Sequence, residues 1–172
     1  MSADELIDVV DDADRVVMQA TRRDVRLRNL RHRSVYVLLF NSAGQLFVHR
    51  RTLTKDVFPG RWDVALGGVL SAGENYDEGA RRELREEVGI DGVPLRRLFP
   101  IRYDDAENRI AGVVYSCMFD GPLHLQASEI AEGRWMDLDV LIERTQRDPF
   151  CPDSLEALRL YLSKLAEVHN RR

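Results

Sequence analysis

Residues 76–88 carry the pattern that most constrains the fold of this chain. Their apolar side chains recur at every fourth position, which places one apolar stripe on an α-helix: Tyr76, Ala80, Leu84 and Val88. Gly89 follows directly, where a glycine commonly ends a helix. A helix with one apolar stripe has to bury it against another layer of structure. The stretch therefore predicts a layered fold with this helix in one of the layers.

The elements expected around this helix are mostly strands. Two hairpins are predicted over 6–21 and 34–51, joined by a short, Arg-rich helical connection within 21–33. Residues 34–40 form a near-continuous apolar run, which is typical of a central strand. Further strands are predicted at 63–68, 94–103, 110–120 and 133–138, and two helices at 138–146 and 153–168. Strands mixed with a few helices, without strict alternation, predict an α+β fold.

The length and composition indicate one globular domain. The chain has 172 residues, of which 44% are hydrophobic and 31% charged, and no repeat or linker divides it. We expect a single domain over 1–172, with an N-terminal hairpin and connector at 1–31 and a core at 32–172. The net charge of -4 argues against a general nucleic-acid binder but allows a small phosphorylated substrate held by a few arginines.

The remaining composition bears on the compartment. Two cysteines, Cys117 and Cys151, are too few for a disulfide framework and lack metal-type spacing, which favours a reducing compartment. The chain has no apolar run long enough to span a bilayer, and its acidic N-terminus does not resemble a signal peptide. We therefore expect a cytoplasmic protein with no membrane partner.

Three carboxylates on the predicted helix suggest chemistry. Glu83, Glu86 and Glu87 stand at i, i+3 and i+4, which puts them on one face within one turn. Like charges so placed repel one another unless a cation lies between them, and Mg²⁺ is held in proteins by carboxylates, waters and substrate phosphates. Arg82 and Arg85 flank the cluster and could offset part of the repulsion. The spacing alone leaves two interpretations open, a metal site and a solvated helix face neutralised by arginines.

A longer pattern decides between them. Gly68 is followed after five residues by Glu74, and after seven more by the run RELREEVGI at 82–90. Seven fixed residues and two aliphatic ones at these spacings should arise by chance in on the order of one chain in ten million. The pattern is the Nudix box at every defined position, and the chain therefore resembles the Nudix hydrolase superfamily.

The resemblance implies an α/β/α sandwich with a central mixed sheet and a loop–helix–loop catalytic motif. It also implies hydrolysis of a nucleoside diphosphate linked to another group, with Mg²⁺ or Mn²⁺ as cofactor. On the family's pattern the metal and general-base carboxylates are Glu83, Glu86 and Glu87, and Glu83 is our first choice for the base.

The family's pattern also covers residues around these carboxylates. It makes the carbonyl of Gly67 a metal ligand, and it makes Glu74 and Arg82 a supporting salt bridge. A further metal-binding acid often precedes a Trp-bearing strand, which here means Glu129 or its rival Glu132. The expected catalytic residues are thus Glu83, Glu86 and Arg82, and the expected metal ligands are Gly67, Glu83, Glu86, Glu87 and Glu129.

Within the superfamily, NSAGQLFVHRRTLTKDVFPGRWD at 41–63 resembles the isopentenyl-diphosphate isomerase branch. In that branch the positions of Arg51 and Lys55 contact the substrate diphosphate, a role that suits two basic residues on one loop. The isomerase needs a Cys-Gly-His run where this chain has Gly67, Gly68 and Val69. Its second catalytic acid lies on a later strand, where this chain reads IAGVVYSCMF at 110–119, without a carboxylate.

These observations favour a metal-dependent hydrolase that cleaves a diphosphate linkage in a nucleoside di- or triphosphate or a nucleoside diphosphate derivative. The alternatives are the isomerase itself and a non-catalytic Nudix scaffold that binds a nucleotide. The expected partner is a small phosphorylated substrate, a nucleotide, with no nucleic acid. The apolar stripe of the last helix makes a homodimer possible.

Overall fold

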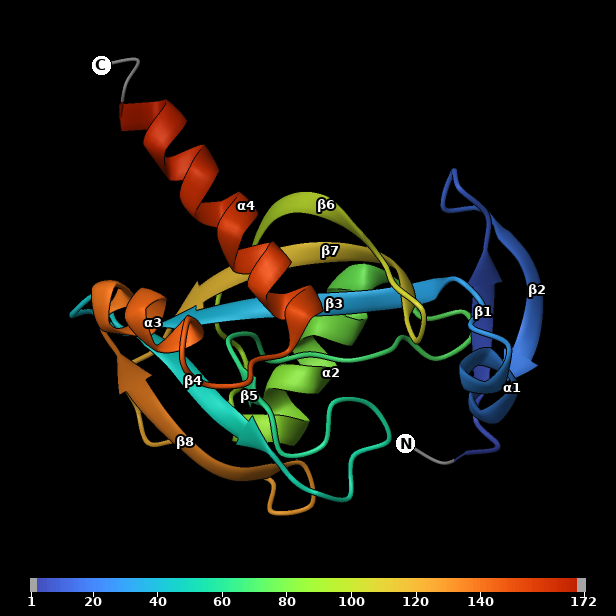
Figure 1. The fold of residues 1–172 in the computed structure, drawn as a ribbon, viewed down its shortest axis with the longest axis horizontal. Helices are drawn as coiled ribbons and strands as arrows, with labels where there is room; N and C mark the ends of the chain where they lie inside the picture. The colour runs from blue at the N-terminus through green and yellow to red at the C-terminus, as the bar shows by residue number, and fades with distance from the viewer. Residues whose placement is uncertain (1–2, 170–172) are drawn as a thin grey trace.

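The computed structural model describes residues 3–169, which form an eight-stranded sheet with helices on its faces (Figure 1). In chain order the elements are β1 (Leu6–Val10), β2 (Val16–Thr21), α1 (Arg22–Leu27), β3 (His32–Phe40), β4 (Leu46–Arg51), β5 (Trp62–Asp63), α2 (Tyr76–Val88), β6 (Arg96–Asp104), β7 (Arg109–Met118), β8 (Ile130–Met136), α3 (Leu138–Thr145) and α4 (Pro152–His169). The predicted α+β class is confirmed.

The sheet has two halves that meet at one end. In the first half β3 runs parallel to β7 along its whole length, and β6 is antiparallel to β7. In the second half β4 is antiparallel to both β5 and β8. The pairing between β3 and β4 consists of Phe40 opposite Leu46, so the two halves separate toward the start of β3 and the end of β4. This opening is where the candidate site lies.

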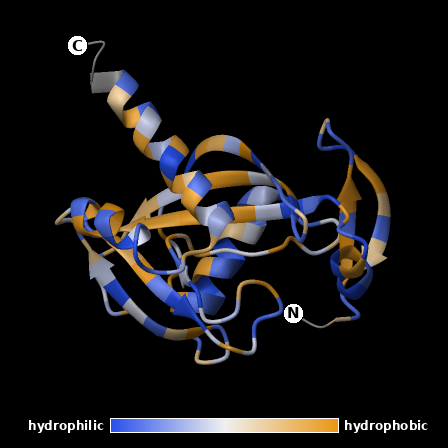
Figure 2. Cartoon of the chain, viewed as in Figure 1, coloured by the Kyte–Doolittle hydropathy of each residue, from blue (hydrophilic) through white to orange (hydrophobic). Residues whose placement is uncertain are grey.

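Both faces of β3 are covered, which explains its near-continuous apolar sequence. Val35, Val37 and Leu39 belong to one buried cluster with the apolar stripe of α2. The alternate residues Tyr36 and Leu38 belong to a second cluster with the first turns of α4. In Figure 1, α2 and α4 accordingly lie on opposite sides of β3, and Figure 2 shows the hydrophobic residues concentrated along β3 and β7. The mixed sheet between helical layers is the architecture that the resemblance implies.

The predicted strand over 63–68 is wrong as a single element. The chain leaves β4 after Asp63 and crosses to β3, where Leu66 bridges Val37 and Val69 bridges Ser34. The strand cannot continue straight because Gly67 has a φ of 147° and its Cα lies against the Val35 carbonyl, with no room for a side chain. This crossing joins the two halves of the sheet. The other predicted elements are present, with ends shifted by a few residues.

The hairpin β1–β2 and helix α1 stand at one end of the molecule (Figure 1). They have a small buried cluster of their own: Ile7, Val9, Ala20 and Val25, with Val69 from the crossing segment. Helix α1 is shorter than the predicted connection and begins at Arg22, after the N-cap Thr21, whose side chain accepts a hydrogen bond from the amide of Asp24. The expectation that 1–31 and 32–172 form one domain stays a prediction.

Helix α4 packs through its first half, where Ala157 and Leu158 are buried, and its second half runs away from the sheet (Figure 1). The homodimer expected from its apolar stripe stays a prediction. Within the part of the chain that the structure describes, no helix has the length and apolar character needed to cross a membrane.

Candidate active site

Helix α2 is fixed at both ends by local sequence. Asn75 accepts a hydrogen bond from the amide of Glu78, whose carboxylate in turn accepts one from the amide of Asn75. Gly89 ends the helix with a φ of 73°, as expected of a C-cap glycine. Gly79, inside the helix, has no role that the sequence reveals. In the structure a Cβ there would overlap the Leu70 side chain, so Gly79 allows the segment before the helix to pack closely on it.

Arg82 organises the acidic face of α2. Its Nε and Nη2 bind the two carboxylate oxygens of Glu74 at 2.8 and 2.9 Å. Its Nη1 donates to Glu83 at 2.8 Å and to Glu86 at 3.2 Å, and Nη2 also reaches the Val69 carbonyl. The Glu74–Arg82 ion pair implied by the resemblance is therefore present, and one guanidinium orients three carboxylates.

Glu83 and Glu87 are buried on this face, whereas Glu86 is half exposed. Burial raises the pKa of Glu83, and burial together with the negative charge of Glu83 raises the pKa of Glu87 to about 8. Gly67 donates its amide to Glu87 at 3.1 Å. A Cβ on Gly68 would lie 2.6 Å from an oxygen of Glu83, so the second glycine provides the space that this carboxylate occupies.

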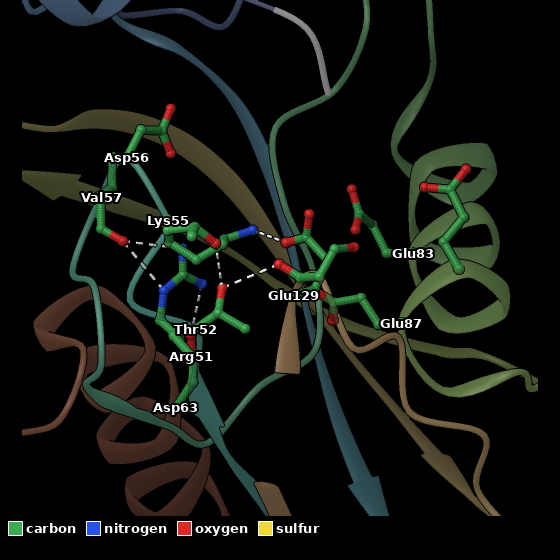
Figure 3. Close-up of polar contacts among 12 residues, drawn as sticks. Arg51, Thr52, Lys55, Asp56, Val57, Asp63, Glu83, Glu87 and Glu129 are labelled. Atoms are coloured by element: carbon green, nitrogen blue, oxygen red, sulfur yellow. Dashed lines mark hydrogen bonds and ion pairs between the residues drawn. The ribbon is translucent and has the colours of Figure 1, made fainter. Parts of the chain in front are cut away.

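Lys55 faces these carboxylates from the loop after β4. Its ammonium forms an ion pair with Glu129, and Figure 3 shows it pointing toward Glu129 with Glu83 beyond. The loop is held there because Thr52 binds the backbone of residues 128 and 129 through its amide and hydroxyl. Glu132, the rival of Glu129, lies on β8 and pairs instead with Arg50 and Arg134. Of the two acids, Glu129 is the one at this site.

Arg51 is engaged by its own loop. Its Nε and Nη2 donate to the Val57 carbonyl at 3.2 and 3.0 Å, and Nη1 lies 3.4 Å from Asp63 (Figure 3). Figure 3 also shows Lys55 and Arg51 on the same side of the opening. In this arrangement Arg51 shapes the loop, and Lys55 has the ammonium that is closest to the acidic face.

A cavity of about 540 Å³ occupies the opening between the two halves of the sheet. Its lining includes the predicted site residues Arg51, Lys55, Gly67, Arg82, Glu83, Glu86 and Glu129, whereas Glu74 and Glu87 are not among the lining residues. Sequence reasoning missed a second group of lining residues: Arg22, Arg26, Tyr36, Asp63, Asn108 and Asp153. These come from elements far apart in the chain. For Arg22 and Arg26 the Arg-rich composition of 21–33 was a sequence signal, and for the other four residues the sequence had none.

The donor set fits a hard divalent cation, because it consists of carboxylates whose charges are poorly compensated where they are buried. Within residues 3–169, however, no three carboxylate, imidazole or thiol side chains already converge as a metal site. The contacts explain this, since Arg82 holds Glu83 and Glu86 while Lys55 holds Glu129. The predicted ligands Gly67, Glu83, Glu86, Glu87 and Glu129 stay a prediction, and these ion pairs would have to open before the carboxylates could hold a cation.

Comparison with known proteins identifies the family. The profile of the NUDIX domain matches residues 30–161. The chain belongs to the Nudix family. A Nudix hydrolase of Pseudomonas aeruginosa, described as uncharacterized, is 48% identical over 158 residues, which is 92% of this chain and 94% of that protein. The Nudix hydrolase YfcD of Escherichia coli, also described as uncharacterized, is 38% identical over 97% of this chain and 92% of its own length.

The Nudix fold is confirmed by a solved structure. The crystal structure of DR0079 from Deinococcus radiodurans superposes with a TM-score of 0.80 at 32% identity, covering 90% of this chain and 98% of that one. Nudix membership supports a hydrolase, and Nudix hydrolases generally use divalent metals. Residues 3–29, with β1, β2 and α1, precede the matched domain.

Proposed function

We propose that this Nudix protein is a divalent-metal-dependent pyrophosphohydrolase. It cleaves a diphosphate linkage in a nucleoside di- or triphosphate or in a nucleoside diphosphate derivative, with Mg²⁺ or Mn²⁺ as cofactor. The observation that carries the proposal is the acidic face of α2. Glu83 and Glu86 line a cavity that Glu129 and Lys55 also line, and Glu87 is buried one helical turn after Glu83.

The charges around the cavity suit a polyanionic substrate bound with cations. Two buried carboxylates with raised pKa gain stability when a cation neutralises them. Once Glu129 turns to a cation, the Lys55 ammonium is free to bind a phosphate oxygen. A bound divalent cation supplies charge neutralisation on the phosphate oxygens and a more acidic water.

The chain's own residues supply the proton transfer. Glu83 accepts the proton of the attacking water, since it lines the cavity on the acidic face of α2. The water oxygen forms the new bond to phosphorus while the anhydride P–O bond breaks. The electron pair of the broken bond stays on the oxygen of the departing phosphate. Arg82 holds Glu83 in position through the contact at 2.8 Å and is itself fixed by Glu74. Glu74 is therefore a positioning residue.

Incubation with Mg²⁺ and a panel of nucleotides tests the proposal. We expect release of phosphate, pyrophosphate or a nucleoside monophosphate, with product identification showing which bond is cleaved. Glu83→Gln should lower kcat by about 100-fold or more, because it removes the base and one ligand together. Glu132→Gln is the matched control and should retain activity, since Glu132 is paired on β8.

Full activity in Glu83→Gln would contradict the role of Glu83. Tight nucleotide binding without turnover, with Mg²⁺ or with Mn²⁺, would favour the non-catalytic scaffold. Interconversion of isopentenyl and dimethylallyl diphosphates would favour the isomerase, which the residues at 67–69 argue against.

A further inference from the structure

The cavity extends beyond the carboxylates of α2 to the other face of the sheet. Tyr36 and Asp153 line it from the α4 side, whereas Glu83 lines it from the α2 side. Its volume of about 540 Å³ lies within the range of small-molecule sites and exceeds what a diphosphate alone requires. The part around Tyr36 and Asp153 has no role in the proposed hydrolysis.

Asp153 is a half-buried acceptor in this part of the cavity. It lies in the first turn of α4, and its Oδ2 accepts a hydrogen bond of 2.9 Å from the Tyr36 hydroxyl. Burial and the nearby charge of Asp63 raise the pKa of Asp153 to about 6, so the carboxyl group is mostly ionised at neutral pH. No basic side chain within residues 3–169 forms an ion pair with Asp153. A donor on a bound molecule would add to the hydrogen bond from Tyr36.

The lining of the cavity is partly apolar. Phe58, Leu27 and Ile110 line the same cavity, and Phe58 is held at a φ of 52°, which is rare for a residue with a large side chain. On another part of the wall, Arg26 is fixed by a hydrogen bond of 2.9 Å to Asn108. Apolar walls with a few fixed polar groups suit a flat heterocycle that has a hydrogen-bonding edge.

We propose that this part of the cavity binds the nucleobase of the substrate, and that Asp153 selects bases that carry an exocyclic amine. The inference rests on the proposed function, because it assigns the substrate's base to the same cavity. An amine donates to a carboxylate, whereas a carbonyl oxygen at the same ring position faces it with a second acceptor. Cytosine and adenine nucleotides are therefore preferred to those of uracil and hypoxanthine. Asp153 acts as a specificity residue and takes no part in the bond cleavage.

Matched nucleotide pairs test the inference. CDP against UDP, and ADP against IDP, differ at the amine position, and the same pairs exist as triphosphates. In the wild-type protein with Mg²⁺ we expect kcat/KM to favour the amine-bearing nucleotide roughly ten- to hundredfold in both pairs. Asp153→Asn should abolish or reverse this preference, because an amide can donate to a carbonyl oxygen. Tyr36→Phe retains the carboxylate and should keep the direction of the preference.

A binding measurement separates this inference from the proposed function. CMP against UMP, and AMP against IMP, can be titrated directly by calorimetry without any turnover. Nucleotide hydrolysis with equal kcat/KM within each pair would overturn the assignment of Asp153 alone. Absence of hydrolysis would overturn the proposed function, while the titrations would still decide the base preference. Equal affinities in the wild-type protein, or a preference unchanged in Asp153→Asn, would refute the inference.

Discussion

At the scale of single residues, Gly79 gives the sharpest prediction about packing. Alanine is the better helix former, yet its Cβ would overlap the buried Leu70 side chain. Gly79→Ala should therefore lower the free energy of unfolding by about 1–3 kcal/mol, measured by urea denaturation. In the Leu70→Ala background the same change should cost clearly less, because the overlapping atoms are gone. Equal costs in the two backgrounds would show that the contact with Leu70 is not the cause.

Lys55 gives a prediction about metal binding. Its ammonium competes with a cation for Glu129 and adds positive charge beside Glu83 and Glu87. Lys55→Met should tighten Mn²⁺ binding about tenfold when no nucleotide is present, measured by calorimetry. The chain's other lysine, Lys164 on α4, is a matched control. Lys164→Met removes the same charge next to the Phe99 ring on β6. Unchanged or weaker Mn²⁺ binding in Lys55→Met would contradict the competition.

Site residues that lie close together in the sequence could be predicted from it. Glu74, Arg82 and the three glutamates lie within 14 residues of one helix and its entry, so the helical period and the box pattern relate them. Tyr36 and Asp153 are 117 residues apart, and neither belongs to a motif. Their meeting depends on how α4 packs on β3. No periodicity in the sequence contains that information.

At the scale of elements, α1 holds the loop after β4 against the cavity. Arg22 of α1 binds Asp56 through Nε and Nη2 at 3.1 and 3.2 Å, and Arg26 lies 3.8 Å from the same carboxylate. Asp56→Asn should loosen the loop and speed tryptic cleavage after Lys55 by up to about fivefold. Asp91→Asn, on a turn that does not line the cavity, should leave the cleavage rate unchanged. Equal rates in both variants would show that α1 does not restrain the loop.

The elements themselves were largely predictable, and their exceptions have physical causes. The apolar run of β3, the hairpin signals and the stripe of α2 each depend on neighbouring residues. The break after β5 depends instead on the backbone of Val35, which Gly67 approaches from another part of the chain. The early start of β8 at Ile130 likewise follows from its pairing with β4.

At the scale of the whole molecule, two buried histidines predict sensitivity to acid. Burial lowers the pKa of His32 and of His49 from 6.5 to about 4. Between these values the unfolded chain binds protons that the folded chain does not, so stability is complete above pH 6.5 and is lost as the pH falls toward 4. We expect each histidine to cost roughly 2 kcal/mol by pH 5. His49→Asn should reduce the dependence of Tm on pH between 7 and 5, and an unchanged slope would exclude His49 as a source.

The space beside Gly68 has a consequence for reading related chains. A side chain at position 68 would crowd the inward-facing carboxylate at position 83, because its Cβ would lie 2.6 Å from a carboxylate oxygen. A homologue with a larger residue at the first position would have to shift this carboxylate, even though its acidic helix looked intact in an alignment. The residue type at position 68 thus indicates whether the glutamate fifteen residues later can occupy the position that Glu83 has here.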